Sequence, residues 1–334
     1  MKSHHDHSHG NHHHHGPVVH EPSAGADEAY ARAYAAAQPD PGRRVIPVEL
    51  EAGEIDWEFV PGTKTRAWGY NGQIPGPVLE GQVGDVLEIR FTNRLPQATN
   101  IHWHGLRVPA AMDGTEMVQQ SVAPGATFVY RFRLPDAGTF WYHPHSNETV
   151  QLEMGLYGAL IVRGPDEPKL DVERVLVLDD VRLDKQGQIA PFGGIVEHHD
   201  GREGDTRLVN GKAEPVLEIA AGQVERWRII NASSARYIQL SVGRKRFQLL
   251  GTDGGLLEAP VKMTEILLAT ADRVDIAVGP FAEGEQLGVE ALQYLRTTIR
   301  KRKDERFAML RVGPARASAA RIPDQLRTIP PLAS

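Results

Sequence analysis

Two histidine pairs of the form His-x-His stand about forty residues apart in the sequence, at His102 and His104 and at His143 and His145. In an extended strand successive side chains point to opposite faces, so the two histidines of each pair share one face. Four imidazoles can therefore converge between two neighbouring strands. Imidazole is a ligand for copper, zinc, iron and nickel, and two pairs of ligands can hold more than one metal ion. Because the sequence contains no cysteine, thiolate ligands are excluded.

The composition is that of an ordinary globular protein. The 334 residues are 24% charged and 41% hydrophobic, and the formal net charge is -6. This length favours two domains, each large enough to bury a core. The acidic balance argues against nucleic acid or an anionic membrane as the main partner, which leaves small molecules or metal ions. No apolar run reaches the roughly eighteen residues of a membrane span, so no membrane span is predicted.

The start of the sequence gives no clear indication of location. No apolar core of a signal peptide follows Met1 and Lys2. Either the protein is not exported, or the exporting segment lies outside this sequence. Because there is no cysteine, disulfides are excluded and cysteine usage does not indicate the redox compartment.

The first twenty residues are rich in histidine and almost free of apolar side chains, so we expect a disordered tail. The irregular spacing favours a natural metal-binding segment, with a purification tag as the alternative, and a metal-buffering role stays open. An alanine-rich stretch at 27–38 predicts a short helix before a break at 39–42. We assign residues 1–44 to this tail and a linker. The tail histidines are His4, His5, His7, His9, His12, His13, His14, His15 and His20.

From residue 44 onward the sequence alternates short β-like runs with turn signals. Pro-Gly and Asn-Gly dipeptides, which favour tight turns, separate the runs. Strands this short and this regularly separated are typical of a β-sandwich or barrel. The runs are 45–50, 78–79, 86–91, 127–134 and 159–162.

The same order of motifs occurs twice. An Asn-Gly pair at 71–72 leads through Pro-Val-Leu to a β-like run at 88–93, and the same order is found from 210–211 to 226–231. Such self-similarity indicates two copies of one domain, with the seam near 164–168. Where the first copy continues into the first histidine pair, the second continues without a histidine. Metal binding is therefore predicted for the first copy alone.

These observations predict a domain organisation. We assign residues 45–165 to a first domain that carries the histidine pairs and residues 166–315 to a second domain without metal ligands. Residues 316–334 are rich in alanine, arginine and proline, which is the composition of a linker. We interpret them as a linker to a third domain that this sequence does not contain.

The motifs resemble those of the multicopper oxidases, the family of laccases, bilirubin oxidases and cuprous oxidases. The resemblance runs from about residue 45 to the end and covers the first two cupredoxin, or plastocyanin-like, domains of a three-domain member. It implies an all-β fold of two tandem cupredoxin-like Greek-key β-sandwiches. The residues that carry it are Tyr70 to Pro77, His102 to Gly105, Asp113, Gly114, Gly138 to His145 and Gly155 to Gly158, followed by Val209 to Gly211, Arg226, Arg228, Asn231, Arg236, Asp253 and Gly254.

In this family, oxidation of a reducing substrate at a type 1 copper is coupled to reduction of dioxygen to water at a trinuclear copper cluster. The resemblance implies copper as the cofactor, with His102 on the type 2 copper and His104, His143 and His145 on the type 3 pair. It implies that Asp113 lies beside the cluster, where a carboxylate orients water and relays protons. It also implies a periplasmic or extracellular location, while the residues themselves leave a cytoplasmic one open.

The sequence departs from the family pattern in what the last domain supplies. The family takes four further cluster histidines, and the cysteine and histidine of type 1 copper, from that domain. Here there is no cysteine, and the histidines after His145 are His198 and His199, which as direct neighbours do not form a His-x-His pair. We therefore expect that this chain alone does not oxidise substrate. A third domain or a partner chain would complete the cluster.

Two other functions stay open on the residues alone. One is a copper-binding or copper-sequestering protein without turnover, and the other is a copper-free cupredoxin scaffold in which the four histidines are ordinary core residues. Asp113 has a simpler interpretation as part of an Asp-Gly turn. Trp103, Trp141 and Tyr142 are interpreted as packing residues on the strand face opposite the ligands. The basic run at 300–303 is interpreted as a solvent-exposed hairpin end.

Overall fold

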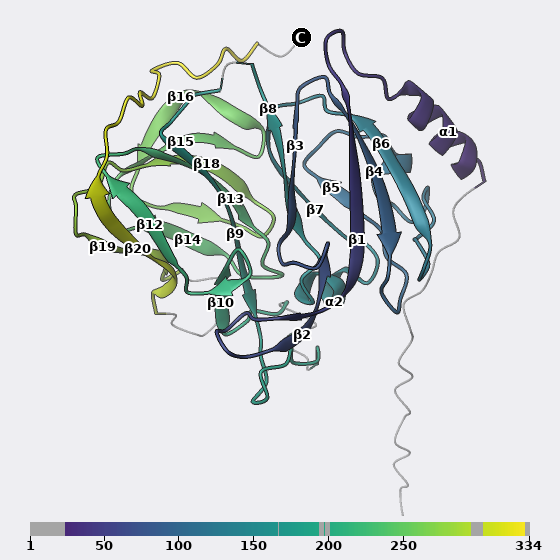
Figure 1. The fold of residues 1–334 in the computed structure, drawn as a ribbon, viewed down its shortest axis with the longest axis horizontal. Helices are drawn as coiled ribbons and strands as arrows, with labels where there is room; N and C mark the ends of the chain where they lie inside the picture. The colour runs from purple at the N-terminus through teal and green to yellow at the C-terminus, as the bar shows by residue number, and fades with distance from the viewer. Residues whose placement is uncertain (1–23, 166, 194–196, 198–200, 295–302, 331–334) are drawn as a thin grey trace, which may run out of the picture.

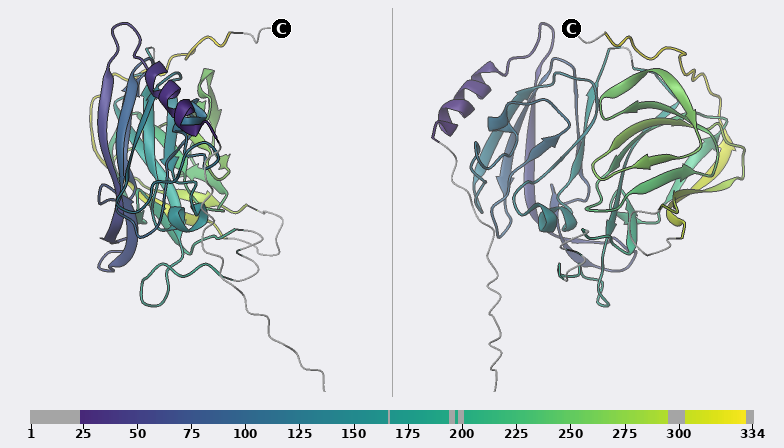
Figure 2. Two further views of the ribbon diagram at one scale, coloured as in Figure 1. Left: turned by 90° about the vertical axis from the view of Figure 1, so that its right-hand side faces the viewer. Right: turned by 180° about the vertical axis from the view of Figure 1, so that it is seen from behind.

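The computed structural model describes residues 24–165, 167–193, 197, 201–294 and 303–330. Two β-sandwiches lie side by side (Figure 1), which confirms the all-β prediction. Viewed from behind, helix α1 (Ala26–Ala36) lies on the side of the first sandwich that is remote from the second (Figure 2). The histidine-rich tail, His198, His199 and residues 300–302 lie outside the described residues.

The first sandwich consists of two four-stranded sheets. One has the strand order β2-β1-β4-β6 and the other β3-β8-β7-β5. Strand β1 pairs with β4 in parallel, as β3 does with β8, and the other neighbours are antiparallel. The strands are β1 Val45–Trp57, β2 Thr65–Tyr70, β3 Gly76–Gln82, β4 Val86–Asn93, β5 His102–His104, β6 Thr127–Arg133, β7 Gly138–His143 and β8 Gly158–Arg163.

This sandwich forms because alternate residues of its strands are apolar and point into one core. In β4, Ile89 and Phe91 are buried whereas Arg90 between them is exposed. Trp103 and Tyr142, from the facing sheet, pack in the same core and are fully buried. Each such side chain contributes about 1.5–3 kcal/mol through the apolar surface that it removes from water. The core therefore stabilises the sheet edge that carries the histidine pairs.

The second sandwich repeats this arrangement with more strands. Its sheets have the orders β11-β10-β9-β13-β18-β15-β16 and β12-β20-β19-β14-β17. Strand β9 pairs with β13 in parallel and β12 with β20, as β1 does with β4 and β3 with β8. The strands are β9 Val172–Val181, β10 Thr206–Val209, β11 Lys212–Ala213, β12 Val216–Ala221, β13 Glu225–Asn231, β14 Ile238–Val242, β15 Phe247–Thr252, β16 Gly255–Met263, β17 Ile266–Leu268, β18 Arg273–Val278, β19 Gln286–Leu292 and β20 Glu305–Ala315.

The two Asn-Gly turns show the repeat at the level of single residues. Asn71 and Asn210 have φ angles of 51° and 50°, and the glycine after each has a φ of 75° or 70°. Positive φ at both central residues is the requirement of a type I′ turn, which Asn-Gly meets best. The side-chain oxygens of the two asparagines accept hydrogen bonds from the backbone N–H groups of Glu51 and Val177, each at 2.7 Å. The sequence repeat is therefore a structural repeat.

An apolar cluster that draws on both sandwiches joins them. Hydrogen bonds cross the same boundary, since the indole N–H of Trp57 donates to the carbonyl of Gly211 at 2.8 Å and the hydroxyl of Thr65 donates to that of Gly187 at 2.6 Å. Exclusion of water from such a boundary holds two domains in a fixed relation. The buried members of the cluster are Phe59, Ala67, Ile74, Trp141, Leu152, Tyr157 and Ala159 from the first sandwich and Val177, Val181, Leu208, Ile230 and Ala232 from the second.

The helices are short and lie around the first sandwich. The predicted helix is confirmed as α1, and its Tyr30 hydroxyl donates to the carbonyl of Val129 in β6 at 3.0 Å. Helix α2 (Glu148–Glu153) follows the second histidine pair, and the 3₁₀ turn η1 (Ala110–Met112) leads into Asp113. Among the described residues, no helix is long and apolar enough to cross a membrane.

Residues 316–330 form neither helix nor strand. They follow β20 and run along the second sandwich (Figure 1). Leu326 in this segment is buried, and its backbone N–H donates to the carbonyl of Glu258 at 2.7 Å. Nearer its start, the hydroxyl of Ser318 donates to Asp171 at 2.6 Å. A stretch with the composition of a linker is therefore attached to the second sandwich at Ser318 and Leu326, although most of its residues are exposed.

Candidate metal centre

Strands β5 and β7 are neighbours at one edge of their sheet and bring the two histidine pairs together. They pair antiparallel, with His102 opposite His143 and His104 opposite Trp141. His102 and His104 lie on the same face of β5, while Trp103 between them points into the core. Antiparallel pairing at the strand ends thus places residues from positions about forty apart within reach of one ion.

Three histidines converge closely. Nitrogen atoms of His102, His104 and His143 all lie within 4.8 Å of one another, and Nδ1 of His104 is 3.2 Å from Nε2 of His143. His145 lies outside this group of three, two residues past the end of β7, and its ring stacks on that of His102 with the centroids 4.2 Å apart. The structure therefore places all four predicted ligands at one locus, three of them in a close group and His145 beside it.

Hydrogen bonds fix which nitrogen of two imidazoles is left for a metal. Nδ1 of His102 lies 2.9 Å from Oδ1 of Asp113, and the same oxygen accepts from the backbone N–H of Trp103 at 3.0 Å. Nδ1 of His143 lies 3.0 Å from the carbonyl of Pro144. Because a carboxylate or carbonyl accepts a hydrogen bond from Nδ1–H, Nε2 carries the lone pair in both rings. Asp113 therefore orients His102 in addition to forming the Asp-Gly turn.

The surroundings favour neutral imidazoles. Burial, together with the nearby Arg273 guanidinium, lowers the pKa of His104 to about 4. Burial also lowers the pKa of His143 and of His145 below the usual value, with the charge of His102 as a further cause. Neutral imidazole is the form that binds metal, so at neutral pH each of these three rings keeps one nitrogen with a lone pair for a metal ion.

Asn100, which no sequence motif indicates as a site residue, holds His145 in place. Its side-chain oxygen accepts from the backbone N–H groups of His145 at 2.7 Å and Ser146 at 3.1 Å. Its side-chain N–H donates to the carbonyl of Gly114 at 2.8 Å. A fully buried side chain with all these bonds made is rigid. Asn100 thus connects the second histidine pair to the turn that contains Asp113.

Comparisons with known proteins place this arrangement in a family. Two family models, both described as multicopper oxidase, match residues 51–167 and 182–285. The crystal structure of a multi-copper oxidase from Pseudomonas Thermotolerans is 35% identical in sequence, with a TM-score of 0.74 over 86% of this chain and 69% of that one. The chain belongs to the multicopper oxidase family. Its fold is two tandem cupredoxin-like β-sandwiches and its cofactor is copper, as predicted.

Two further relatives show how much of a multicopper oxidase this chain represents. A metallo-oxidase of Campylobacter jejuni is 33% identical with a TM-score of 0.77, over 87% of this chain and 61% of that one. The Staphylococcus aureus protein "Multicopper oxidase mco" is 32% identical over 241 residues, which are 69% of this chain and 52% of that protein. The chain therefore spans about half the length of the curated relatives that it matches.

Copper fits the donor set of this multicopper oxidase chain. Imidazole nitrogen is a good ligand for copper ions. Two nitrogens bound to one ion at about 2.0 Å each lie roughly 3 Å apart, and the nitrogens of His104 and His143 are separated by 3.2 Å. His102, His104 and His143 could hold a metal ion in this arrangement, with His145 beside them.

The interpretation of Trp141 as a residue on the face opposite the ligands is wrong. Trp141 and His143 are two residues apart on β7 and so share a face, with ring centroids 4.2 Å apart. The centroid of Trp141 is also 5.1 Å from that of His104. Trp103 and Tyr142, in contrast, do pack together in the core, with centroids 5.8 Å apart. Trp141 therefore forms one wall of the histidine cluster.

Glycine is required at position 105, the last residue of the first histidine motif, for two reasons. One is its backbone conformation and the other is the neighbouring side chain of Arg273. Its φ is 85°, a left-handed conformation that glycine adopts without strain. A Cβ atom at this position would lie 2.2 Å from Nη2 of Arg273, which comes from β18 of the second sandwich. The guanidinium of Arg273 therefore lies against the end of β5, directly after His104.

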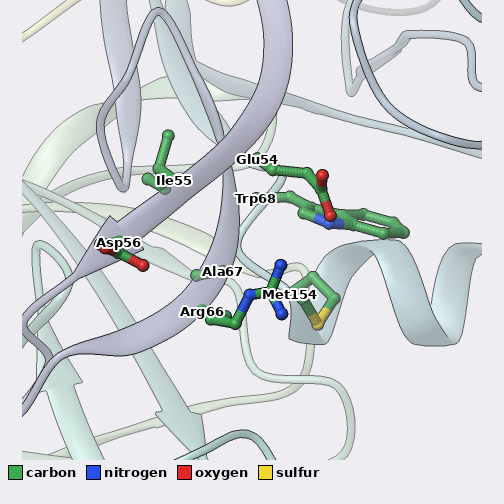
Figure 3. A pocket seen from close by; sticks show the side chains of 7 residues that line it. All are labelled: Glu54, Ile55, Asp56, Arg66, Ala67, Trp68 and Met154. Atoms are coloured by element: carbon green, nitrogen blue, oxygen red, sulfur yellow. The ribbon is translucent and has the colours of Figure 1, made fainter.

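The pocket shown in Figure 3 is separate from the histidines. It has a volume of about 290 Å³ and lies between β1, β2 and the residue after α2. Figure 3 shows the carboxylate of Glu54 beside the indole of Trp68, its cross-strand partner. None of the four histidines lines this pocket. The pocket is lined by Glu54, Ile55, Asp56, Arg66, Ala67, Trp68 and Met154.

Proposed function

We propose that this chain supplies half of the ligands of a trinuclear copper cluster in a multicopper oxidase that couples oxidation of a reducing substrate to reduction of dioxygen to water. The proposed ligands are His102 for the type 2 copper and His104, His143 and His145 for the type 3 pair. The observation that carries the proposal is the convergence of these rings from β5 and β7, with Asp113 bonded to one of them. Copper, when bound there, supplies the one-electron redox steps and the binding site for dioxygen.

The side chains of this chain have two tasks in the proposal. The first is to present lone pairs at fixed positions, which the hydrogen bonds of His102 and His143 at Nδ1 achieve. The second is to move protons, because reduction of dioxygen to water consumes them. The side chain of Asp113 is 22% exposed while one of its oxygens holds His102. It can therefore exchange protons with solvent without releasing the ligand.

We assign the remaining ligands and the site where electrons enter to a third domain or a partner chain. Support comes from the length of the curated relatives, about twice that of the matched part, and from the absence of cysteine in this sequence. In the same proposal, residues 45–165 form the ligand-bearing cupredoxin domain and 166–315 the second one, with 1–44 as a tail and linker and 316–334 as a connection. The location is periplasmic or extracellular, which cell fractionation would test.

Copper content tests the ligands. With a competing chelator present to remove copper from the histidine-rich tail, the full chain is expected to retain copper and the variant His104→Ala/His143→Ala to lose it. The matched control, His12→Ala/His13→Ala, removes two tail histidines and is expected to retain copper like the unsubstituted chain. Unchanged copper content in the first variant would contradict the site assignment.

Oxygen consumption tests the reaction. The chain alone is expected to consume no dioxygen with a phenolic substrate, because it has no type 1 copper. Co-expression with a third cupredoxin domain from a relative is expected to restore consumption, and His104→Ala/His143→Ala is expected to abolish it again. Bound copper without any oxygen consumption in the complemented protein would contradict the oxidase and leave copper sequestration.

A further inference from the structure

One face of strand β7 carries three residues with different tasks. Thr139, Trp141 and His143 share this face, whereas Phe140 and Tyr142 between them point into the core of the first sandwich. His143 belongs to the histidine cluster. Thr139 and Trp141 contact the second sandwich, whose strands β13, β16 and β18 lie against β7. The ligand strand is therefore in contact with a domain to which no histidine pair has been assigned.

Thr139 is held by three residues of the second sandwich. Its hydroxyl donates to Oδ1 of Asp275 at 2.6 Å and accepts from Nη1 of Arg228 at 3.1 Å. Its backbone carbonyl accepts from Nε of Arg273 at 3.2 Å. Thr139 is buried, and hydrogen bonds to charged partners are stronger than those between neutral groups. The start of β7 is thus fixed from the second sandwich, four residues before His143.

The partners of Thr139 are fixed in turn. Oδ2 of Asp275 accepts from both Arg226 and Arg228, and Nε of Arg228 lies 3.1 Å from Glu173. Arg228 is 0% exposed and Arg226 2% exposed. Buried charges of this kind keep one arrangement, because any movement that leaves one of them unpaired is costly. Thr139 is therefore attached to a rigid group.

Trp141 provides a second point of attachment. It is buried in the apolar cluster shared by the two sandwiches, together with Ile230 of β13. Its other contacts are the rings of His104 and His143, at centroid distances of 5.1 and 4.2 Å. A side chain packed to native density on both sides cannot shift without moving its neighbours. The indole of Trp141 thus lies between the second sandwich and the imidazoles of His104 and His143.

We propose that the second sandwich positions the copper ligand His143 on β7 and, through Trp141, its neighbour His104, with Thr139 as the positioning residue and Asp275 and Arg228 as its anchor. This inference rests on the proposed function, since it takes His104 and His143 as copper ligands. A metal site needs its ligands held within about 0.5 Å of the required geometry. Strand β7 is hydrogen-bonded at Thr139 and packed at Trp141, and the next residue on the same face is His143. The two contacts therefore restrict the position of this ligand.

The test compares variants of Thr139 in the full chain. Thr139→Val removes the hydroxyl and keeps the shape, whereas Thr139→Ser keeps the hydroxyl. Copper affinity is measured by chelator competition, and the copper of the tail is subtracted with the His104→Ala/His143→Ala form of each chain. Affinity is expected to fall about tenfold in Thr139→Val, with an altered electron paramagnetic resonance spectrum of bound copper(II), and to be retained in Thr139→Ser.

Thr65→Val is the matched control. Thr65 is also fully buried, and its hydroxyl also donates across the boundary between the sandwiches, at 2.6 Å, but β2 carries no proposed ligand. It is expected to lower the unfolding temperature while copper affinity and spectrum stay unchanged. Arg228→Lys keeps the charge but not the planar fork, in which Nη1 reaches Thr139 and Asp275 while Nη2 reaches Glu167. It is expected to weaken copper binding as Thr139→Val does, and it serves as the test if Thr139→Val does not fold.

The outcomes separate the two proposals. The positioning role alone would be overturned if Thr139→Val and Thr65→Val changed copper affinity equally. It would also be overturned if copper affinity stayed unchanged in both Thr139→Val and Arg228→Lys. An unsubstituted chain that binds no copper beyond its tail would overturn the proposed function, and the positioning role with it.

Discussion

The two sandwiches share a topology and differ in the stretch of chain after the strand that ends in asparagine. In both, the side-chain oxygen of this asparagine accepts a hydrogen bond from a backbone N–H two residues further on. Asn93 accepts from Leu95 at 2.9 Å, and Asn231 accepts from Ser233 at 3.2 Å. In the first sandwich the chain then enters β5 with its two histidines. In the second it reaches Arg236, which is buried and pairs with Asp180.

This difference teaches that the fold does not depend on the metal. Each sandwich has its own apolar core, with Trp103 central to one and Trp227 to the other, and both side chains are fully buried. The corresponding stretch carries the first histidine pair in one copy and a buried ion pair in the other. Function is thus added at a site on a scaffold that is stable for other reasons. The second sandwich, for which no metal ligand is proposed, contacts the first one instead. The buried charges of its strands β13 and β18 lie against β7.

The largest effect on stability is expected from removing one member of this group of buried charges. Asp275→Ala removes a carboxylate that Arg226 and Arg228 share, both almost fully buried. We expect the free energy of unfolding to fall by about 3–5 kcal/mol, measured by urea denaturation, because two guanidinium groups lose a partner that water cannot replace. Glu218→Ala is the control, since Glu218 and its partner Arg311 are each 59% exposed, and should change stability by less than about 1 kcal/mol. Equal losses would contradict the special role of the buried group.

The next effect concerns the boundary between the sandwiches and depends on pH. Burial raises the pKa of Glu153, at the end of α2, to about 7, although Arg202 of the other sandwich opposes the shift. The folded state therefore keeps a proton that the unfolded state loses from about pH 4.5 upward. This contribution to stability is present below pH 4.5, declines as the pH rises to 7, and stays lost above it.

Glu153→Gln removes this dependence. The variant should match the unsubstituted chain near pH 4.5 and exceed it at pH 8 by on the order of 2–3 kcal/mol, measured as the difference between two denaturation series. The difference between the two proteins is measured because His104, whose pKa is lowered to about 4, makes stability rise with pH between pH 4 and 6.5. His104 is present in both proteins, so its contribution cancels in the difference. Glu51→Gln, at an exposed carboxylate, is the control and should follow the unsubstituted chain. A constant difference across the pH range would argue against a protonated Glu153.

A smaller effect is expected at Asp113, which in the proposed function orients one of the copper ligands. Asp113→Asn keeps the shape but replaces the carboxylate that holds Nδ1 of His102. Copper affinity outside the tail should fall about tenfold, as for other residues that orient a ligand. Asp136→Asn, at an exposed pair with Arg107, should leave it unchanged. If both variants bind copper equally well, Asp113 is a turn residue and no more.

Much of this structure could be predicted from the sequence because its signals are local. The Asn-Gly turns, the short apolar runs and the spacing of His102 and His104 depend on residues close together in the chain, and they indicated the strands, the repeat and the β5 pair. The structure extends several runs, since β1 continues to Trp57 where the apolar pattern had suggested an end at Leu50. Pairing with β2 stabilises this extension.

The remainder depends on contacts between distant residues. His145 is not placed by strand alternation, because β7 ends at His143 and Asn100, 45 residues earlier, holds its backbone. The anchor of Thr139 lies 136 residues away at Asp275, and neither residue type is unusual where it stands. Trp141 differs from these cases, because its spacing of two residues from His143 is sufficient to place both side chains on one face of β7.

The smallest effect tests the repeat itself. Asn71→Ala and Asn210→Ala each place alanine at a φ near 50°. Each also removes two equivalent side-chain hydrogen bonds, with Glu51 and Glu49 in one copy and with Val177 and Val175 in the other. Each should lower the free energy of unfolding by about 1 kcal/mol, since alanine does not favour left-handed backbone. Asn71→Gly and Asn210→Gly keep the backbone conformation and isolate the contribution of the side-chain hydrogen bonds. The two turns have the same geometry, but only the turn at Asn71 belongs to the sandwich that carries the histidines. The two losses of stability should therefore agree, and copper affinity should change in neither variant. A cost confined to the first copy would mean that its turn supports the metal centre as well as the strand pairing.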